Sequence, residues 1–107
     1  MTPRISPKEI PADAFERNGY IAFWNEWQRR YKEGLMLLSL ETGREMEISH
    51  GTLHYFISHK NGVWSLYCEE TQEMQYFPAW RALYDTASLG NILLKDDISN
   101  VTFDEIL

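Results

Sequence analysis

Two short turn signals within residues 43–77 constrain the fold of this chain more than any other feature. The dipeptides His50-Gly51 and Asn61-Gly62 separate three runs in which apolar and polar residues alternate. Alternation with a period of two is typical of strands that bury one face, and a two-residue loop containing glycine joins such strands into hairpins. The pattern therefore predicts an antiparallel β-meander.

The two loops also predict the register of the strands. If each dipeptide is a two-residue loop, the first places Ile48 opposite Leu53 and the second places Ile57 opposite Leu66. A shift of one residue in the second hairpin would mix polar and apolar side chains on one face, so the segregated register is favoured. It predicts one apolar core face composed of Met46, Ile48, Leu53, Tyr55, Ile57, Trp64, Leu66 and Cys68.

A helical pattern precedes the meander, over residues 20–42. Four rings recur at spacings of four, three and four residues and would share one helix face: Tyr20, Trp24, Trp27 and Tyr31. Such a stripe is usually part of a core, and a groove for a partner is the alternative. Gly34 predicts a helix end. Residues 35–40 then fit a short second helix somewhat better than a strand, because they lack β-branched residues.

The two ends of the chain carry weaker signals. Prolines at positions 3, 7 and 11 predict a flexible arm over residues 1–11. After the meander, residues 74–77 fit a fourth strand of undetermined register, and residues 78–107 predict a C-terminal helical segment. Within it, Thr102 and Glu105 resemble a capping box, which predicts a last helical turn.

Together these elements predict one α+β domain over residues 1–107. Its core is an antiparallel β-meander of three to four strands, packed on one face by helices. A chain of 107 residues supports a single hydrophobic core. Cys68 is the only cysteine, which excludes an internal disulfide and a thiolate zinc cluster, and we expect it to be buried.

The net charge of −6 is unevenly distributed. Residues 1–62 contain eight acidic and eight basic residues, whereas residues 63–107 contain eight acidic residues against Arg81 and Lys95. This acidity disfavours nucleic acid and anionic lipid, and it favours a basic protein partner. Acidic side chains that merely solvate the fold are the alternative. The chain has no apolar run of membrane-spanning length and no signal-peptide core, so we expect a cytoplasmic protein.

The predicted register also assigns the face opposite the core. It places Glu45, Phe56 and Tyr67 in one cross-strand row and Glu47, His54 and Glu69 in the next. Carboxylates on both sides of a histidine should raise its pKa, which makes His54 a candidate pH-sensitive or metal-binding residue. A solvated ladder of opposite charges is the competing interpretation.

Phe56 and Tyr67 are unusual for a solvent-exposed sheet face. Either a helix covers the two rings, or they form a contact site. The sequence contains no phosphate-binding loop, dinucleotide fingerprint, zinc-protease motif or serine-hydrolase motif. No nucleophile is visibly paired with a base, and we therefore expect a protein that is not an enzyme.

From Gly43 onward, the order of GREMEI, a turn, LHYFIS, NG, VWSLYCEE and QYFPAWRALYDTA resembles small bacterial and phage proteins built as helix, β-meander and helix. The resemblance covers about half of the chain and rests on pattern and length. Some of these proteins are encoded in mobile elements or beside toxin-immunity genes. The resemblance implies a binding or inhibitory role without naming a target.

We therefore expect a small protein-binding or inhibitory protein of immunity or anti-defence type that blocks a basic partner surface. The expected partner-binding residues are Phe56, Tyr67, Glu45, Glu47, His54, Glu69 and Glu70. A small-molecule-binding or metal-binding domain centred on His54 with Glu47 and Glu69 is one alternative. A structural homodimer is another. No cofactor is expected.

Overall fold

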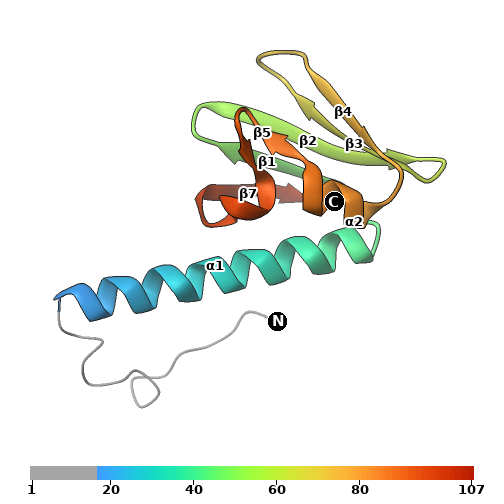
Figure 1. Ribbon diagram of the computed structural model, residues 1–107. Helices are drawn as coiled ribbons and strands as arrows, with labels where there is room; N and C mark the ends of the chain where they lie inside the picture. Colours follow the sequence, from blue (N-terminus) through green and yellow to red (C-terminus); the bar gives the residue numbers. More distant parts are fainter. Residues whose placement is uncertain (1–16) are drawn as a thin grey trace.

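The computed structural model describes the backbone of residues 17–107 and the side chains from Phe23 onward. It has two layers, a five-stranded antiparallel sheet and the helices that pack on one side of it (Figure 1). The predicted α+β class is confirmed. The predicted arm over residues 1–11 lies outside the described residues. The strands of the sheet are β1 (Met46–His50), β2 (Leu53–Lys60), β3 (Val63–Cys68), β4 (Met74–Phe77) and β7 (Val101–Ile106), in the order β4-β3-β2-β1-β7.

The remaining elements precede the sheet or connect β4 to β7. The long helix is α1 (Arg17–Glu41), and the short helix α2 (Trp80–Thr86) lies within the segment predicted to be helical. The other connecting elements are β5 (Ser88–Leu89), β6 (Ile92–Leu93), and the 3-10 helices η2 (Leu94–Asp96) and η3 (Ile98–Asn100). Gly90, with a φ of 70°, lies in the turn of the β5–β6 hairpin. No described helix is long and apolar enough to cross a membrane.

The second hairpin has the predicted register. Ile57 pairs with Leu66, and Phe56 pairs with Tyr67. Asn61 and Gly62 both have positive φ, 54° and 81° respectively. A type I′ turn requires this conformation at both central residues, and asparagine followed by glycine adopts it most readily.

The predicted register of the first hairpin is wrong by two residues. His50 pairs with Leu53 and Ile48 pairs with Tyr55, so the loop is Gly51-Thr52 rather than His50-Gly51. Gly51 is the only loop residue with positive φ, which suits the first central position of a type II′ turn. Because the shift is an even number of residues, every side chain stays on its predicted face.

The predicted core face is therefore confirmed. Seven of its eight side chains are buried, and Leu53 is half-buried and packs against them. Cys68 is buried, as expected. The apolar side chains that pack against this face come from α1, α2, the two 3-10 helices and the first residue of β7: Met36, Leu40, Leu83, Leu94, Ile98 and Val101.

The helix α1 differs from the prediction in two ways. It continues through Gly34, so residues 35–40 are helical but do not form a separate second helix. Gly34 is exposed, and an exposed glycine inside a helix costs only about 1 kcal/mol, which packing of Met36 and Leu40 offsets. The helix ends before Gly43, whose φ of 74° is the left-handed conformation that commonly follows a helix.

The aromatic stripe of α1 is not part of the core, contrary to the prediction. Trp24 stacks on Trp27 at 5.0 Å between ring centroids, and Trp27 stacks on Tyr31 at 5.8 Å. Trp24 is 38% exposed, and none of the three rings belongs to the buried cluster. The N-terminal half of α1, which carries Trp24 and Trp27, extends beyond the sheet (Figure 1), whereas Tyr31 is half-buried beside residues of β7. The side chain of Tyr20 lies outside the described side chains.

The predicted last helical turn is also wrong, because these residues form the edge strand β7. Strand β7 pairs with β1, which is distant in sequence. This pairing forms hydrogen bonds with backbone N–H and C=O groups that a single helical turn would leave free. Lys32 fixes the preceding connection to α1 by donating from Nζ to the carbonyl oxygen of Ser99 at 2.8 Å. The sheet therefore has five strands rather than four.

Candidate functional site

The side of the sheet opposite the core is not covered by a described helix. Both helices lie on the other side (Figure 1). We call this side the open face, and its central side chains come from all five strands. They are Glu47, Ser49, His54, Phe56, Ser58, Ser65, Tyr67, Met74, Tyr76, Asp104 and Glu105.

One cross-strand row spans the whole open face. It runs from Glu105 of β7 through Glu47, Phe56 and Tyr67 to Met74 of β4. The row is acidic at its β7 end and aromatic or apolar from β2 to β4. The face therefore has an acidic half next to an apolar half.

A β-bulge in β7 increases the charge of the acidic half. Phe103 pairs with Ile48 and Glu105 pairs with Glu47, so Asp104 is an extra residue in the ladder. A bulge turns two consecutive side chains towards the same side of a sheet. Accordingly Asp104 and Glu105 are both exposed, while Phe103 packs against the core.

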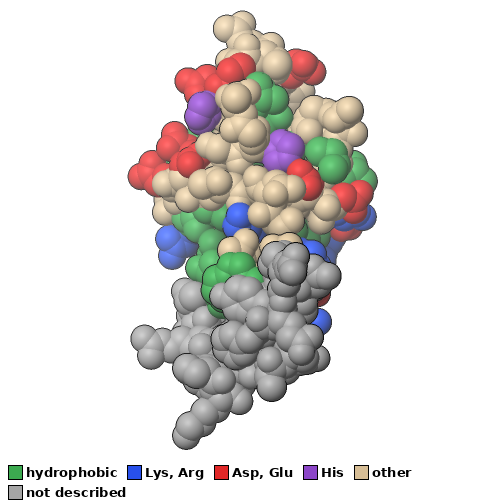
Figure 2. Space-filling model, turned by 90° about the vertical axis from the view of Figure 1, so that its left-hand side faces the viewer, with side chains coloured by type: hydrophobic (Ala, Val, Ile, Leu, Met, Phe, Trp, Pro, Cys, Tyr) green, Lys and Arg blue, Asp and Glu red, His purple; other side chains and the backbone are tan. Residues whose placement is uncertain are grey.

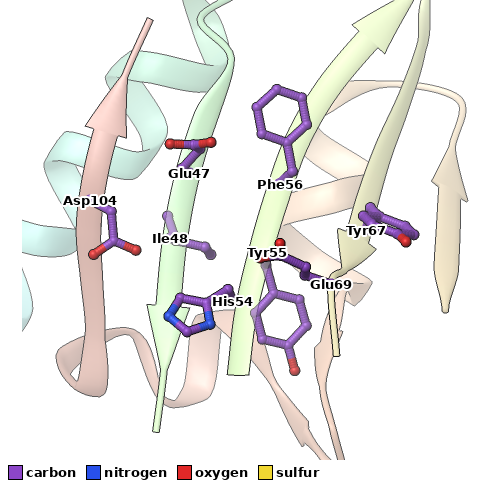
Figure 3. Close-up of a pocket in the computed structure, with 8 residues that line it drawn as sticks. All are labelled: Glu47, Ile48, His54, Tyr55, Phe56, Tyr67, Glu69 and Asp104. Carbon is purple, nitrogen blue, oxygen red and sulfur yellow. The ribbon is translucent and has the colours of Figure 1, made fainter. Parts of the chain in front are cut away.

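A hollow of about 450 Å³ lies where the two halves meet. Its lining includes the carboxylates of Glu47, Glu69 and Asp104 and the rings of Phe56 and Tyr67. Figure 3 shows Asp104, Glu47, Phe56 and Tyr67 on neighbouring strands from β7 to β3, and Glu69 in the turn after β3. The hollow is thus bordered by Glu47 and Asp104 on one side and by the two rings on the other, where Glu69 adds a third carboxylate.

His54 lies beside this hollow, and its main partner is Glu70. The Glu70 carboxylate is 2.6 Å from Nδ1 of His54 through one oxygen, and it accepts the backbone N–H of His54 at 2.7 Å through the other. Glu70 is the chief reason that the pKa of His54 is raised, with smaller contributions from the charges of Glu69 and Asp104. The same contact lowers the pKa of Glu70.

The predicted rows on this face are therefore shifted. Glu47, not Glu45, lies opposite Phe56, and Ser49, not Glu47, lies opposite His54. The prediction that carboxylates raise the pKa of His54 is correct in direction, but the main carboxylate is Glu70. The two-residue shift of the first hairpin explains the changed rows, whereas Glu70 reaches His54 from the turn after β3.

The acidic half is electrostatically strained. The pKa of Glu47 is raised chiefly by a hydrogen bond between its carboxyl group and that of Glu105, followed by burial and by the charges of Glu105, Asp104 and Glu69. Ser49 donates a hydrogen bond to Asp104, but a neutral hydroxyl does not cancel its charge. The folded protein therefore holds several carboxylates close together.

No lysine or arginine of the described chain forms an ion pair with these carboxylates. Arg29 and Arg30 instead pair with carboxylates of α1 itself. In Figure 2 most of the acidic side chains lie at the height of the sheet, and the basic side chains lie lower, towards α1. Among the described residues, His54 is therefore the basic side chain that partly balances the negative charge of the open face, through its contact with Glu70.

The structure brings most of the predicted site residues together. Phe56, Tyr67, Glu47, His54 and Glu69 all line the hollow. Glu70 does not line the hollow itself but contacts the ring of His54, which does. Glu45 does not line the hollow, and it precedes β1, where its carbonyl oxygen accepts the backbone N–H of Leu107 at 2.8 Å.

Sequence reasoning missed Asp104, Glu105 and the apolar contribution of β4. Both acids fall in the segment that the capping-box pattern predicts as a helical turn, and the bulge breaks the alternation that would indicate a strand. The register of β4 was undetermined, and the structure places Met74 opposite Tyr67 and Tyr76 opposite Ser65. Met74 and Tyr76 are 44% and 68% exposed, which enlarges the apolar half.

One group of side chains has the composition of a metal site. His54, Glu69 and Glu70 each offer a ligand atom, and these atoms lie within 4.8 Å of one another. All three residues are exposed. Glu47, which the sequence suggested as a ligand, is not in the group.

Comparison with known proteins gives no relative for this chain. No protein-family model, curated protein or solved structure matches it significantly. The site is therefore interpreted from its own geometry.

Proposed function

We propose that this protein binds another protein through the open face and blocks a basic surface of that partner. The observation that carries the proposal is the open face itself, in which carboxylates without a described lysine or arginine partner adjoin half-buried rings on a side that no described helix covers. Aromatic side chains commonly anchor interfaces, and complementary charge guides the encounter.

The two halves of the face would act in different ways. Phe56 and Tyr67, already half-buried and paired across β2 and β3, would lose further water-exposed area on binding at little cost in side-chain entropy. Glu47, Asp104 and Glu105 would attract lysine and arginine side chains of the partner. The mechanism is steric exclusion strengthened by charge, and it needs no bond-making step.

The resemblance to small proteins of mobile elements and toxin-immunity neighbourhoods supports an inhibitory role of immunity or anti-defence type. The blocked surface would then be the nucleic-acid-binding or otherwise basic surface of a toxin or defence protein, because such surfaces match an acidic inhibitor. The proposal places both proteins in the cytoplasm. A homodimer that closes the open face is the competing arrangement.

The test is affinity capture from host lysate with the whole chain and with the double variant Phe56→Ala/Tyr67→Ala. We expect the double variant to lose the partner, because removing a central aromatic anchor commonly weakens an interface by about 2 kcal/mol or more, roughly thirtyfold. Leu38→Ala is the matched control, since Leu38 is 55% exposed on α1 and lies outside the open face. Sedimentation of the purified protein separates a homodimer from a heterologous complex.

Two results would refute this function. One is a partner that both the double variant and the control retain equally. The other is a stable homodimer that the double variant dissociates, which would assign the open face to self-association. Raising the salt concentration should weaken a genuine complex, because its charges lie at an exposed surface.

A divalent metal ion is a second candidate ligand, favoured by the convergence of His54, Glu69 and Glu70. Imidazole and carboxylate ligands suit zinc and neighbouring transition metals. Zinc or nickel should then raise the melting temperature of the protein, and His54→Ala should abolish the rise. An equal rise in His54→Ala would exclude this site.

A further inference from the structure

We infer that the hollow on the open face receives the guanidinium group of one arginine from the partner. This inference rests on the proposed function and specifies the chemistry that the site recognises. It is carried by the joint presence of three carboxylates and two rings around a single hollow.

The carboxylates surround the hollow from two directions. Glu47 and Asp104 come from the adjacent strands β1 and β7, and Glu69 follows β3 (Figure 3). A guanidinium group is planar and carries five N–H donors that diverge within its plane. It can therefore donate to carboxylates on both sides at once, which the compact ammonium group of lysine does less well.

The rings supply a second contact suited to the same group. Phe56 and Tyr67 lie directly opposite each other on β2 and β3, and both line the hollow. A guanidinium group stacks on aromatic faces, and its weak hydration lowers the cost of leaving water. A ring beside carboxylates thus favours arginine over lysine and over small inorganic cations.

The carboxylates that line the hollow have no lysine or arginine partner among the described residues. The Glu70 carboxylate already contacts both the backbone N–H and the ring of His54. We therefore do not assign Glu70 to binding the guanidinium group. Glu47, Asp104 and Glu69 line the hollow without an ion pair to a lysine or arginine of the described chain. A guanidinium group placed among them would offset the repulsion that Asp104 and Glu69 exert on Glu47.

The direct test measures binding of three blocked tripeptides, acetyl-Gly-X-Gly-amide, to the whole protein by NMR. X is arginine, lysine or citrulline, and citrulline has nearly the shape of arginine without its charge. We expect the arginine peptide to shift the backbone amides around His54 and Tyr67 and to bind at least about tenfold more tightly than the citrulline peptide, a difference of about 1.4 kcal/mol. The lysine peptide should bind with intermediate affinity.

Two variants assign the binding to the hollow. The double variant Glu47→Gln/Asp104→Asn should abolish binding of the arginine peptide, and Phe56→Leu should weaken it, because it keeps an apolar side chain but removes the aromatic face. The control Glu41→Gln removes a carboxylate from the exposed end of α1, on the other side of the sheet, and should bind the peptide normally. Retained folding of each variant is read from the same spectra.

The inference is overturned if citrulline binds as well as arginine, if the charge-removing double variant still binds, or if about 10 mM arginine peptide shifts nothing. These outcomes are distinguishable from failure of the proposed function. A partner protein that depends on Phe56 and Tyr67 but not on Glu47 and Asp104 would preserve the function and refute the guanidinium site. If the arginine peptide binds but no partner protein is captured, the guanidinium site is supported and the proposed function is refuted.

Discussion

The core face and the open face are built from alternate residues of the same strands, yet they are organised by different forces. Leu66 and Tyr67 are neighbours on β3, and the first is fully buried under the helices whereas the second lines an open hollow. The core face is uniformly apolar. The open face is divided into an acidic half and an aromatic half, and the acidic half contains contacts that disfavour the folded state.

This difference shows which residues serve stability and which serve another purpose. Burial of the core face stabilises the fold, because apolar surface leaves water. Clustering of Glu47, Asp104 and Glu105 has the opposite effect, and a sequence shaped only by stability would place a lysine among them. Local features that oppose folding are typical of functional surfaces.

The largest expected effect compares the two faces at neighbouring positions. Leu66→Ala should lower the free energy of unfolding by about 2–5 kcal/mol, because it leaves a cavity in the core. Tyr67→Ala should lower it by about 1 kcal/mol or less, the scale of one cross-strand pair. Urea denaturation of both variants measures the difference. Equal losses would mean that the open face is buried in solution.

A smaller effect of opposite sign is expected from removing repulsion on the open face. The pKa of Glu47 is raised in the folded protein, so its ionisation opposes folding at pH values above its ordinary value of 4.5. Glu47→Gln should therefore raise the melting temperature at neutral pH, on the order of a few degrees, and the gain should vanish in acid.

The exposed variant Glu41→Gln is the control for this gain, because no described contact of Glu41 involves another carboxylate. Added salt should reduce the gain in Glu47→Gln by screening the repulsion. A Glu47→Gln variant that is less stable than the natural protein at neutral pH would contradict the proposed strain. The same variant tests whether the fold gives up stability for binding, since it should also weaken binding of the arginine peptide.

The smallest effect concerns the contact of His54 with Glu70. The raised pKa of His54 means that this contact stabilises the fold fully below pH 6.5 and is lost as the pH rises through the raised value. The lowered pKa of Glu70 means that the stabilisation is present above pH 4.5 and is lost as the pH falls through the lowered value. The maximum therefore lies between pH 4.5 and 6.5.

His54→Gln should consequently reduce the melting temperature most within that window, by about 1–2 °C, because the contact is largely exposed and water screens it. Thermal unfolding across pH 3 to 9 gives the profile. Glu70→Gln should show the same loss, and combining both changes should add nothing further. A constant difference at all pH values would exclude an ionic contact.

Much of the fold could be predicted from local patterns. Alternation over residues 43–77 gave the strands, and Asn61-Gly62 gave the second loop with its register, since both residues readily adopt positive φ. The first loop was less certain, because a lone glycine fits either position of a two-residue turn. The helical pattern of α1 is also a local signal. Gly34 wrongly indicated a helix end, because the packing that lets the helix continue is not visible in the local sequence.

The candidate site was predicted only in part. Phe56, Tyr67, Glu69 and His54 could be assigned to one face because that assignment depends on alternation alone. Their neighbours depend on pairing between strands, and an error of two residues replaced Ser49 by Glu47 beside His54. Asp104 was missed, because the bulge in β7 interrupts the period of two.

The sequence by itself determined which side chains share a face, since the period of two is a property of the extended backbone and survives any even shift in register. The tertiary structure alone decided which charges became neighbours. It brought β7 to β1 across about half of the chain, and the long separation leaves no local signal of that pairing. The hollow exists because these distant segments meet, and its acidic side could not be recognised before they were placed together.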